Sequence, residues 1–160
     1  LEQYMIEERG LLMKQGIRVQ VIGRREGIPD RVLNEINKTI ELTSANQGTT
    51  LCLAINYGAR GEISDALKQI ACQIETGLLK ATDVDEQLIS ENLYTSGMPD
   101  PDLLIRTSGE MRISNFLLWH ISYAELWVTE KFWPEFTEED LHQAMNVFAT
   151  RNRRFGGLTS

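Results

Sequence analysis

The stretch "TTLCLAIN", residues 49–56, decides the fold class. It is a short continuous apolar run that ends at the turn "NYG", which is the pattern of a strand covered on both faces. Upstream, "GIRVQVIG" at residues 16–23 alternates, with Ile17, Val19 and Val21 on one face, and predicts a strand that ends at Gly23. Because helical sequence separates these two runs, we expect them to pair in parallel.

Helical periodicity fills the intervals between the predicted strands. Residues 1–15 have a helical pattern, and a second helix is expected after Pro29, which suits a first helical turn. A long amphipathic helix and a shorter one, residues 82–95, follow the second strand. The residues expected to face the core are Val32, Leu33, Ile36 and Ile40 in the second helix and Ile63, Leu67, Ile70, Ile74 and Leu78 in the long helix.

The C-terminal third repeats the alternation. "LLIRT" predicts a strand, Ser114 is expected to open a helix through "NFLLWHISYA", and "ELWVT" predicts a last strand. Thr137 with Asp140 three residues later predicts a capping box for a closing helix, with Leu141, Met145 and Phe148 facing inward. The rhythm predicts an α/β domain over residues 1–160, with a parallel central sheet, helices on both faces and ligands beyond the carboxyl ends of the strands.

Composition narrows the function. The 160 residues carry a formal net charge of −7, with 42% hydrophobic and 24% charged residues. An acidic chain is a poor match to broad nucleic-acid binding, which depends on Lys and Arg, so we expect no nucleic-acid partner. Cys52 and Cys72 lack metal or redox spacing and are expected to be buried, reduced thiols in a cytoplasmic protein. We expect neither a signal peptide nor a membrane-spanning helix.

Glycine and arginine follow three of the predicted strands, in "VIGRRE", "INYGARGE" and "IRTSGEMRIS". In the third, Arg106 ends the strand, Gly109 allows a turn, Arg112 returns to the same point and Ser114 begins the next helix. Guanidinium forks and a helix N-terminus both bind phosphate oxygens, so this peptide predicts an anion cradle. The pattern equally allows Arg106 to pair with Glu110 and Ser114 to be an ordinary helix cap.

Other candidates are weaker on the pattern alone. Glu125 has no second carboxylate at a telling spacing, and His120 and His142 lack a metal-ligand pattern. The aromatic residues between 116 and 136 fit packing before they fit a ligand site. The basic tail "RNRRFGG" suits either a local anionic partner or the closing of a helix against its dipole.

The segments "NYGARGEI", "DLLIRTSGEMRISNFLLWHISYAELWVTEKFWPEF" and "NVFATRNRRFGG" closely resemble the C-terminal part of the cis-prenyltransferases, the family of bacterial undecaprenyl diphosphate synthase. The resemblance runs over essentially the whole chain. It implies a cytoplasmic homodimeric enzyme, able to associate peripherally with the inner face of the plasma membrane. The implied reaction extends an allylic diphosphate, typically farnesyl diphosphate, with isopentenyl diphosphate. The implied cofactor is Mg²⁺, and the implied polyprenyl product partitions into the membrane for cell-wall synthesis.

The resemblance also implies roles for individual residues. It assigns Arg106, Arg112, Ile113 and Ser114 to the diphosphate of the isopentenyl substrate, and Glu125 to magnesium binding. Arg154 and Gly156, in the "RFG" of the tail, match a family motif that reaches a substrate across the dimer interface. The aromatic-rich stretch from residue 116 to 133 is implied to lie at that interface.

One departure is large. The family's Asp-Gly-Asn-Gly-Arg-Trp stretch, which supplies a magnesium-binding aspartate and the allylic diphosphate loop, does not occur in these 160 residues. Together with the start at Leu1, this leads us to expect an N-terminally incomplete domain that carries only the isopentenyl side and has little synthase activity alone. The alternatives are a non-catalytic subunit of a heterodimeric cis-prenyltransferase and a generic α/β phosphate-binding module.

Overall fold

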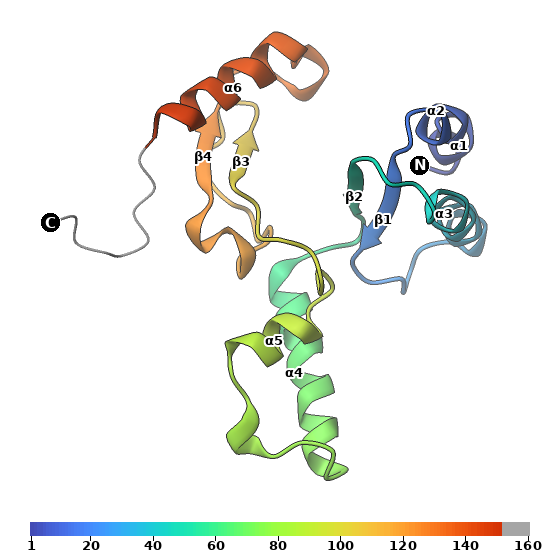
Figure 1. Ribbon diagram of the computed structural model, residues 1–160, viewed down its shortest axis with the longest axis vertical. Helices are drawn as coiled ribbons and strands as arrows, with labels where there is room; N and C mark the ends of the chain where they lie inside the picture. The colour runs from blue at the N-terminus through green and yellow to red at the C-terminus, as the bar shows by residue number, and fades with distance from the viewer. Residues whose placement is uncertain (152–160) are drawn as a thin grey trace, which may run out of the picture. The chain divides into compact units, whose positions relative to one another are not determined.

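The computed structural model describes residues 1–151, which divide into two compact units, Leu1–Gly97 and the residues from Met98 onward (Figure 1). Each unit has its own pair of parallel strands, and each is described by itself. The sequence prediction of a single domain stays a prediction. Among the described residues, no helix is both long enough and apolar enough to cross a bilayer.

The first unit alternates helices and strands around one parallel strand pair. In it, β1 and β2 pair in parallel with Arg18 opposite Thr50 and Ile22 opposite Ala54. Its elements are α1 (Glu2–Glu7), α2 (Arg9–Lys14), β1 (Arg18–Ile22), α3 (Asp30–Thr43), β2 (Thr50–Ala54), α4 (Ala59–Glu75), the 3-10 helix η1 (Ala81–Asp83) and α5 (Glu86–Asn92).

The second unit is built on another parallel pair, in which Leu103 lies opposite Glu125 and Arg106 opposite Val128. Helix α6 contacts β4 and runs beside the pair (Figure 1). The elements are β3 (Leu103–Arg106), the 3-10 helix η2 (His120–Tyr123), β4 (Glu125–Val128), the 3-10 helix η3 (Trp133–Glu135) and α6 (Glu138–Thr150).

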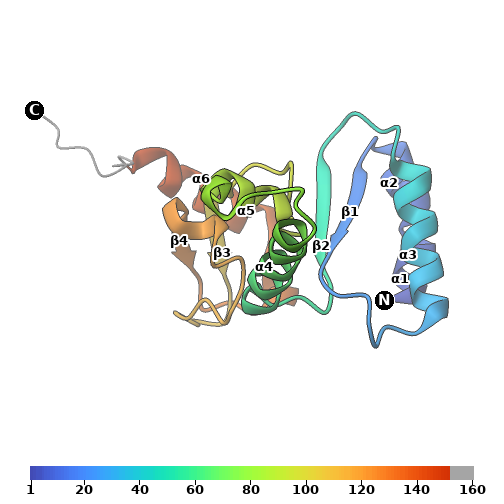
Figure 2. The same cartoon turned by 90° about the horizontal axis from the view of Figure 1, so that it is seen from below.

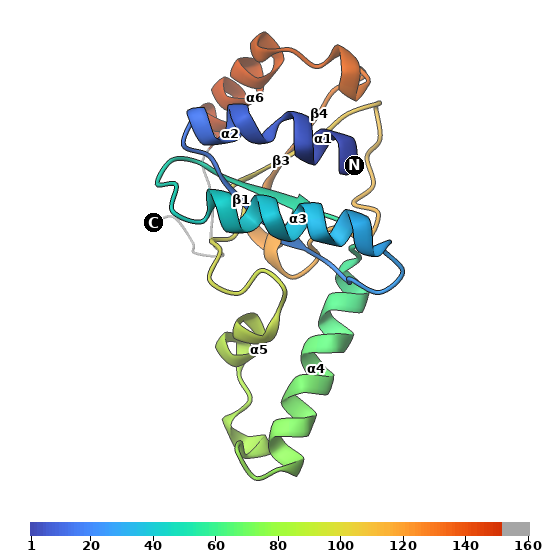
Figure 3. The same cartoon turned by 90° about the vertical axis from the view of Figure 1, so that its right-hand side faces the viewer.

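Helices α1, α2 and α3 lie on one side of the β1–β2 pair and cover it there (Figures 2 and 3). The apolar core between them centres on Met5, Val19 and Ile36. A buried hydroxyl adds a polar link, because Thr43 Oγ1 accepts a hydrogen bond from the backbone N–H of Val19 at 3.0 Å and donates to the carbonyl of Thr39 at 2.8 Å. This link satisfies a backbone group of β1 that no strand partner reaches.

The α/β class and the parallel pairing of the strands are confirmed. Three local expectations are wrong in this chain. The helix expected over residues 1–15 is interrupted at Glu8 and forms α1 and α2. Strand β2 is not covered on both faces, since Leu51 is 40% exposed. The thiols expected to be buried are not fully so, since Cys52 is only partly buried and Cys72 is exposed. Each unit contributes one hydrogen-bonded pair of parallel strands.

The inward faces of two helices also differ from the prediction. In α4 the buried positions are Ala59, Glu62, Ala66 and Ile70, whereas Leu67 is 49% exposed. In α6 they are Asp140 and Ala144, and the predicted core residues Leu141 and Met145 are largely exposed. In both helices the buried face includes a carboxylate, Glu62 or Asp140, so the covered side is not the most apolar one.

Gly23 ends β1 where the chain passes very close to the segment after β2. Its φ is +113°, and a Cβ there would lie against the carbonyl oxygen of Ile55, inside any real Cβ contact. Only glycine fits this conformation and this approach together.

Replacing Gly23 by alanine is expected to destabilise the first unit by about 3 kcal/mol or more, through backbone strain and the collision with Ile55. Gly27→Ala is the matched control, because Gly27 also has a positive φ of +80° but has open space around it. That control is expected to lose about 1–2 kcal/mol. Urea denaturation followed by circular dichroism measures both, and equal losses would contradict the close approach at Gly23.

Candidate functional site

Backbone hydrogen bonds fix the turn that follows β3. The N–H of Ser108 donates to the carbonyl of Lys131 at 2.8 Å, and the N–H of Gly109 donates to the carbonyl of Thr129 at 2.9 Å. Ser108 and Gly109 both have positive φ, of 65° and 63°. A side chain on Gly109 would collide with the carboxylate of Glu130. The segment after β4 therefore holds the turn after β3 in a conformation that favours glycine.

Arg106 is the last residue of β3 and stands at the base of this turn. Its Nε atom is buried and has no hydrogen-bond partner among the described residues. The possible pairing of Arg106 with Glu110 is not what forms, since Glu110 binds Arg112 instead, at 2.8 Å from Arg112 Nη2. A buried N–H donor that makes no hydrogen bond is energetically costly. Arg106 can therefore gain a hydrogen bond from an anionic acceptor.

Arg112, Ile113 and Ser114 follow on an exposed loop. The Arg112 side chain is 72% exposed, so its pair with Glu110 is a weak surface contact. The prediction that Ser114 opens a helix is wrong. Ser114 and Asn115 have φ of 52° and 62°, outside the helical region, and the next helical turn is the short η2. The loop thus offers a guanidinium and a hydroxyl without a helix N-terminus.

Glu125 lies at the other end of the strand pair from Arg106. It begins β4 opposite Leu103, three residues from the position opposite Arg106. Its Oε2 accepts a hydrogen bond from Arg151 Nη1 at 2.6 Å, and the same Nη1 donates to the carbonyl of Leu126 at 3.1 Å. Glu125 and Arg106 therefore do not share one cluster within this unit.

The described residues do not by themselves fit a magnesium site. No group of three or more His, Cys, Asp or Glu side chains gathers anywhere in residues 1–151. Glu125 would supply one carboxylate, and that carboxylate is already engaged by a cation, Arg151. Magnesium prefers several oxygen ligands in octahedral geometry. The other predicted tail residues, Arg154 and Gly156, lie outside the described residues.

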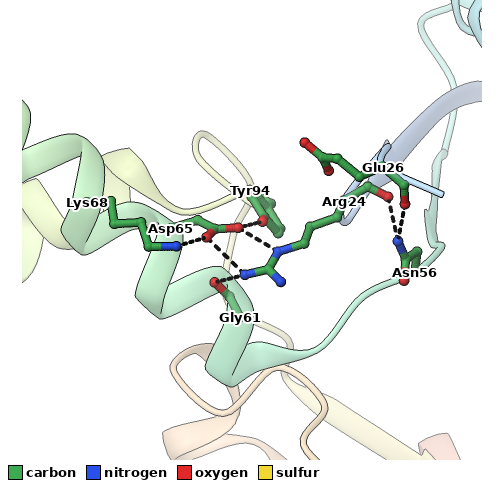
Figure 4. A network of polar contacts seen from close by, with 7 residues as sticks. All are labelled: Arg24, Glu26, Asn56, Gly61, Asp65, Lys68 and Tyr94. Atoms are coloured by element: carbon green, nitrogen blue, oxygen red, sulfur yellow. Dashed lines mark hydrogen bonds and ion pairs between the residues drawn. The ribbon is translucent and has the colours of Figure 1, made fainter.

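The first unit carries a second polar constellation, at the end of β1 (Figure 4). Arg24 binds the carboxylate of Asp65 on α4 with both Nε and Nη2, at 2.8 and 2.9 Å. The Tyr94 hydroxyl donates to the same carboxylate, and Lys68 Nζ lies 3.3 Å from it. A cavity of about 640 Å³ opens here between residues 23–26, α4 and Tyr94. Arg24, which the sequence predicted to bind an anion at this strand end, is thus paired with Asp65 of the same chain.

A buried carboxylate lies next to this network. Glu62 is fully buried; its Oε2 accepts from the Tyr57 hydroxyl at 2.5 Å and its Oε1 accepts from the backbone N–H of Tyr94 at 3.0 Å. Asn56 closes the other side, because its amide donates to the carbonyls of Arg24 and Glu26 (Figure 4). These contacts join the ends of β1 and β2 to α4 and to the loop after α5.

Sequence reasoning found the arginines and missed their partners. It selected "VIGRRE" and "NYGARGE", which contain Arg24, Asn56 and Glu62, yet it did not single out Asp65 or Tyr94. These residues are 41 and 70 positions from Arg24 in the chain, and no local pattern joins them. The polar position Glu62 on an otherwise apolar helix face was the one available signal.

The network predicts how the first unit responds to acid. Hydrogen bonds from Arg24 and Tyr94 hold the pKa of Asp65 well below its ordinary value of 3.8. The resulting stabilisation is present above that ordinary value and is lost as the pH falls through the lower pKa of the folded state. Asp65→Asn is therefore expected to reduce the acid sensitivity of the first unit while lowering its stability at neutral pH.

Urea midpoints measured from about pH 7 to about pH 2 test this expectation. Asp100→Asn is the control, because Asp100 is exposed and has no side-chain partner among the described residues. Parallel curves for the wild type and Asp65→Asn would show that Asp65 carries no pH-dependent stability.

The chain is an α/β protein with parallel strand pairs. At the end of β3, the fixed turn and the buried Nε–H of Arg106, which has no acceptor among the described residues, form an arrangement that suits a phosphate-like anion. A family model described as "Putative undecaprenyl diphosphate synthase" matches residues 1–156. The chain belongs to this prenyltransferase family, and the resemblance expected from its sequence is confirmed.

Individual relatives agree. The isoprenyl transferase of Rhodopirellula baltica is 49% identical over 99% of this chain and 65% of its own length. That of Geobacillus kaustophilus is 47% identical over 99% of this chain and 62% of its own. The crystal structure of lavandulyl diphosphate synthase from Lavandula x intermedia, in complex with dimethylallyl diphosphate, has a TM-score of 0.94 and 36% identity, covering 98% of this chain and 68% of that one. The chain thus spans a little under two thirds of the length of these curated isoprenyl transferases.

Proposed function

We propose that this chain forms the isopentenyl diphosphate half of a cis-prenyltransferase that elongates an allylic diphosphate. In the reaction, the double bond of isopentenyl diphosphate attacks the first carbon of the allylic partner. The allylic diphosphate leaves with the bonding electron pair, and loss of a proton restores a double bond. Membership of the prenyltransferase family supports the reaction class, and the unpaired Nε–H of Arg106 supports the assignment of the half-site.

Arg106 is proposed as the principal diphosphate ligand. Its Nε–H is already removed from water and has no acceptor among the described residues, so a phosphate oxygen would regain a charge-assisted hydrogen bond that the free chain lacks. The turn at residues 107–109 is held by backbone hydrogen bonds to the segment after β4. Binding therefore needs little ordering of the backbone around Arg106.

Arg112, Ile113 and Ser114 are proposed to close over the same diphosphate. Arg112 must leave Glu110 to do so, and an exposed pair of this kind costs little to break, about 0–1 kcal/mol. Ile113 and Ser114 are exposed residues, so they are accessible to a ligand. Because the diphosphate of isopentenyl diphosphate stays attached during the reaction, these residues orient the nucleophile and break no bond.

Magnesium belongs to the proposed reaction, where it would stabilise the leaving allylic diphosphate. The prediction that Glu125 binds it gains no support from the described residues, because Arg151 holds that carboxylate and no group of three or more His, Cys, Asp or Glu side chains gathers in residues 1–151. Assembly as a homodimer likewise stays a prediction, as do the roles of Arg154 and Gly156. The 160 residues contain no Asp-Gly-Asn-Gly-Arg-Trp stretch, so we expect them to bind isopentenyl diphosphate with little turnover on their own.

Arg106→Ala tests the half-site. Calorimetric titration with isopentenyl diphosphate is expected to show affinity lower by about tenfold to a hundredfold, the loss of one or two hydrogen bonds to a charged group. Arg18→Ala is the matched control, since Arg18 is an exposed arginine of β1 with no side-chain partner among the described residues, and we expect its affinity to match the wild type. Equal affinity in all three proteins would place the diphosphate elsewhere.

A second assay separates binding from chemistry. The 160 residues are incubated with farnesyl diphosphate, labelled isopentenyl diphosphate and Mg²⁺, and extractable polyprenyl product is counted. We expect binding without appreciable product. Product at the rate of full-length isoprenyl transferases would contradict this expectation. It would mean that residues of this chain bind the allylic diphosphate without the Asp-Gly-Asn-Gly-Arg-Trp stretch.

A further inference from the structure

The carboxylate that the family resemblance assigns to a metal has a different partner in this structure. We propose that Glu125 anchors Arg151, and that Arg151 is a positioning residue that fixes the C-terminal end of α6 at the start of β4. This inference does not depend on the diphosphate site at Arg106. It concerns a separate end of the β3–β4 pair, three residues away along the strands.

The geometry of the contact supports an anchor. Arg151 is the C-cap of α6, and its backbone N–H closes the last turn by donating to the carbonyl of Phe148 at 3.1 Å. Its Nη1 donates to Glu125 Oε2 at 2.6 Å and to the carbonyl of Leu126 at 3.1 Å. One guanidinium nitrogen thus binds both a side chain and the main chain of β4, which fixes its position more tightly than a single surface ion pair does.

The surroundings explain why this contact matters for α6. The helix has no basic residue in its last turn. The favourable positive charge at its carbonyl end is supplied by Arg151, the residue that follows the helix. Its N-terminal end is already fixed, because Asp140 accepts from the backbone N–H of Thr137 and binds Lys131 at 2.7 and 2.8 Å. With Arg151 bound to Glu125, both ends of α6 are attached to the segment that begins at β4.

The same contact disfavours a metal at Glu125. A divalent cation would have to displace the guanidinium and would find no further His, Cys, Asp or Glu cluster among residues 1–151. The side chains of Glu125 and Arg151 are 26% and 38% exposed, so the pair is accessible to competing ions and can be tested in solution.

Hydrogen exchange followed by mass spectrometry tests the anchor on the 160-residue chain. Glu125→Gln and Arg151→Gln are each expected to raise exchange in the last turn of α6 by about two- to fivefold, as for loss of one partly exposed ion pair and its hydrogen bonds. The double variant is expected to exchange no faster than Arg151→Gln alone, since Arg151→Gln already removes the contact with Glu125. Glu138→Gln is the control, because it removes an exposed carboxylate of α6 that does not reach β4.

Binding of Mn²⁺, a paramagnetic substitute for Mg²⁺, gives the second readout by electron paramagnetic resonance. An anchor predicts that wild type and Glu125→Gln bind the ion equally. The proposal is overturned if Glu125→Gln loses Mn²⁺ binding while Arg151→Gln gains it, which is the signature of a metal ligand restrained by an arginine. It is also overturned if the two single variants leave exchange unchanged or if their effects add in the double variant.

Discussion

The backbone hydrogen bonds between the turn after β3 and the segment after β4 hold the proposed site in place. Ser108 and Gly109 donate to the carbonyls of Lys131 and Thr129, and these bonds extend the parallel pairing beyond the ends of the strands. Lys131 is in turn bound by Asp140 at the first turn of α6. The position of Arg106 thus depends on a helix cap more than thirty residues later in the chain.

Buried polar contacts, in addition to a small apolar core, attach the elements of the first unit to one another. The core of the first unit centres on three buried residues, and the hydroxyl of Thr43 and the carboxylate of Glu62 complete the attachment of α3 and of the loop after α5. Buried polar groups stabilise a fold only when their partners are present. The strand ends are therefore geometrically specified, which is what a site for a small charged ligand requires.

The sequence was sufficient for the class, the strands and the capping box of α6, because each rests on a short-range pattern. It was not sufficient for the side of a helix that is covered. The period of α4 marks a stripe through Leu67, yet burial follows Ala59, Ala66 and Ile70, since neighbouring elements and not periodicity decide what is covered. The left-handed conformation at Ser114 could not be read from "ISNF" for the same reason.

The candidate site was predicted in part. Arg106 and its turn follow from the residues themselves, because an apolar run that ends in Arg-Thr-Ser-Gly predicts a strand, its terminal arginine and a glycine-containing turn. The partners of Glu125 and Arg24 could not be predicted, because Arg151 and Asp65 are distant in the chain and no short pattern joins them. Ion pairs of this kind depend on tertiary placement, and they determine which predicted ligands are free to bind.

The most direct measurement is the side-chain ¹⁵N–¹H spectrum of the arginine Nε–H groups during titration with isopentenyl diphosphate. The Arg106 signal, identified by its loss in Arg106→Lys, is predicted to move furthest and to become more protected from exchange with water, because its Nε–H gains the acceptor that it lacks in the free chain. If isopentenyl diphosphate binds and the Arg106 signal stays where it was, the diphosphate does not lie at Arg106 and the account of this site is wrong.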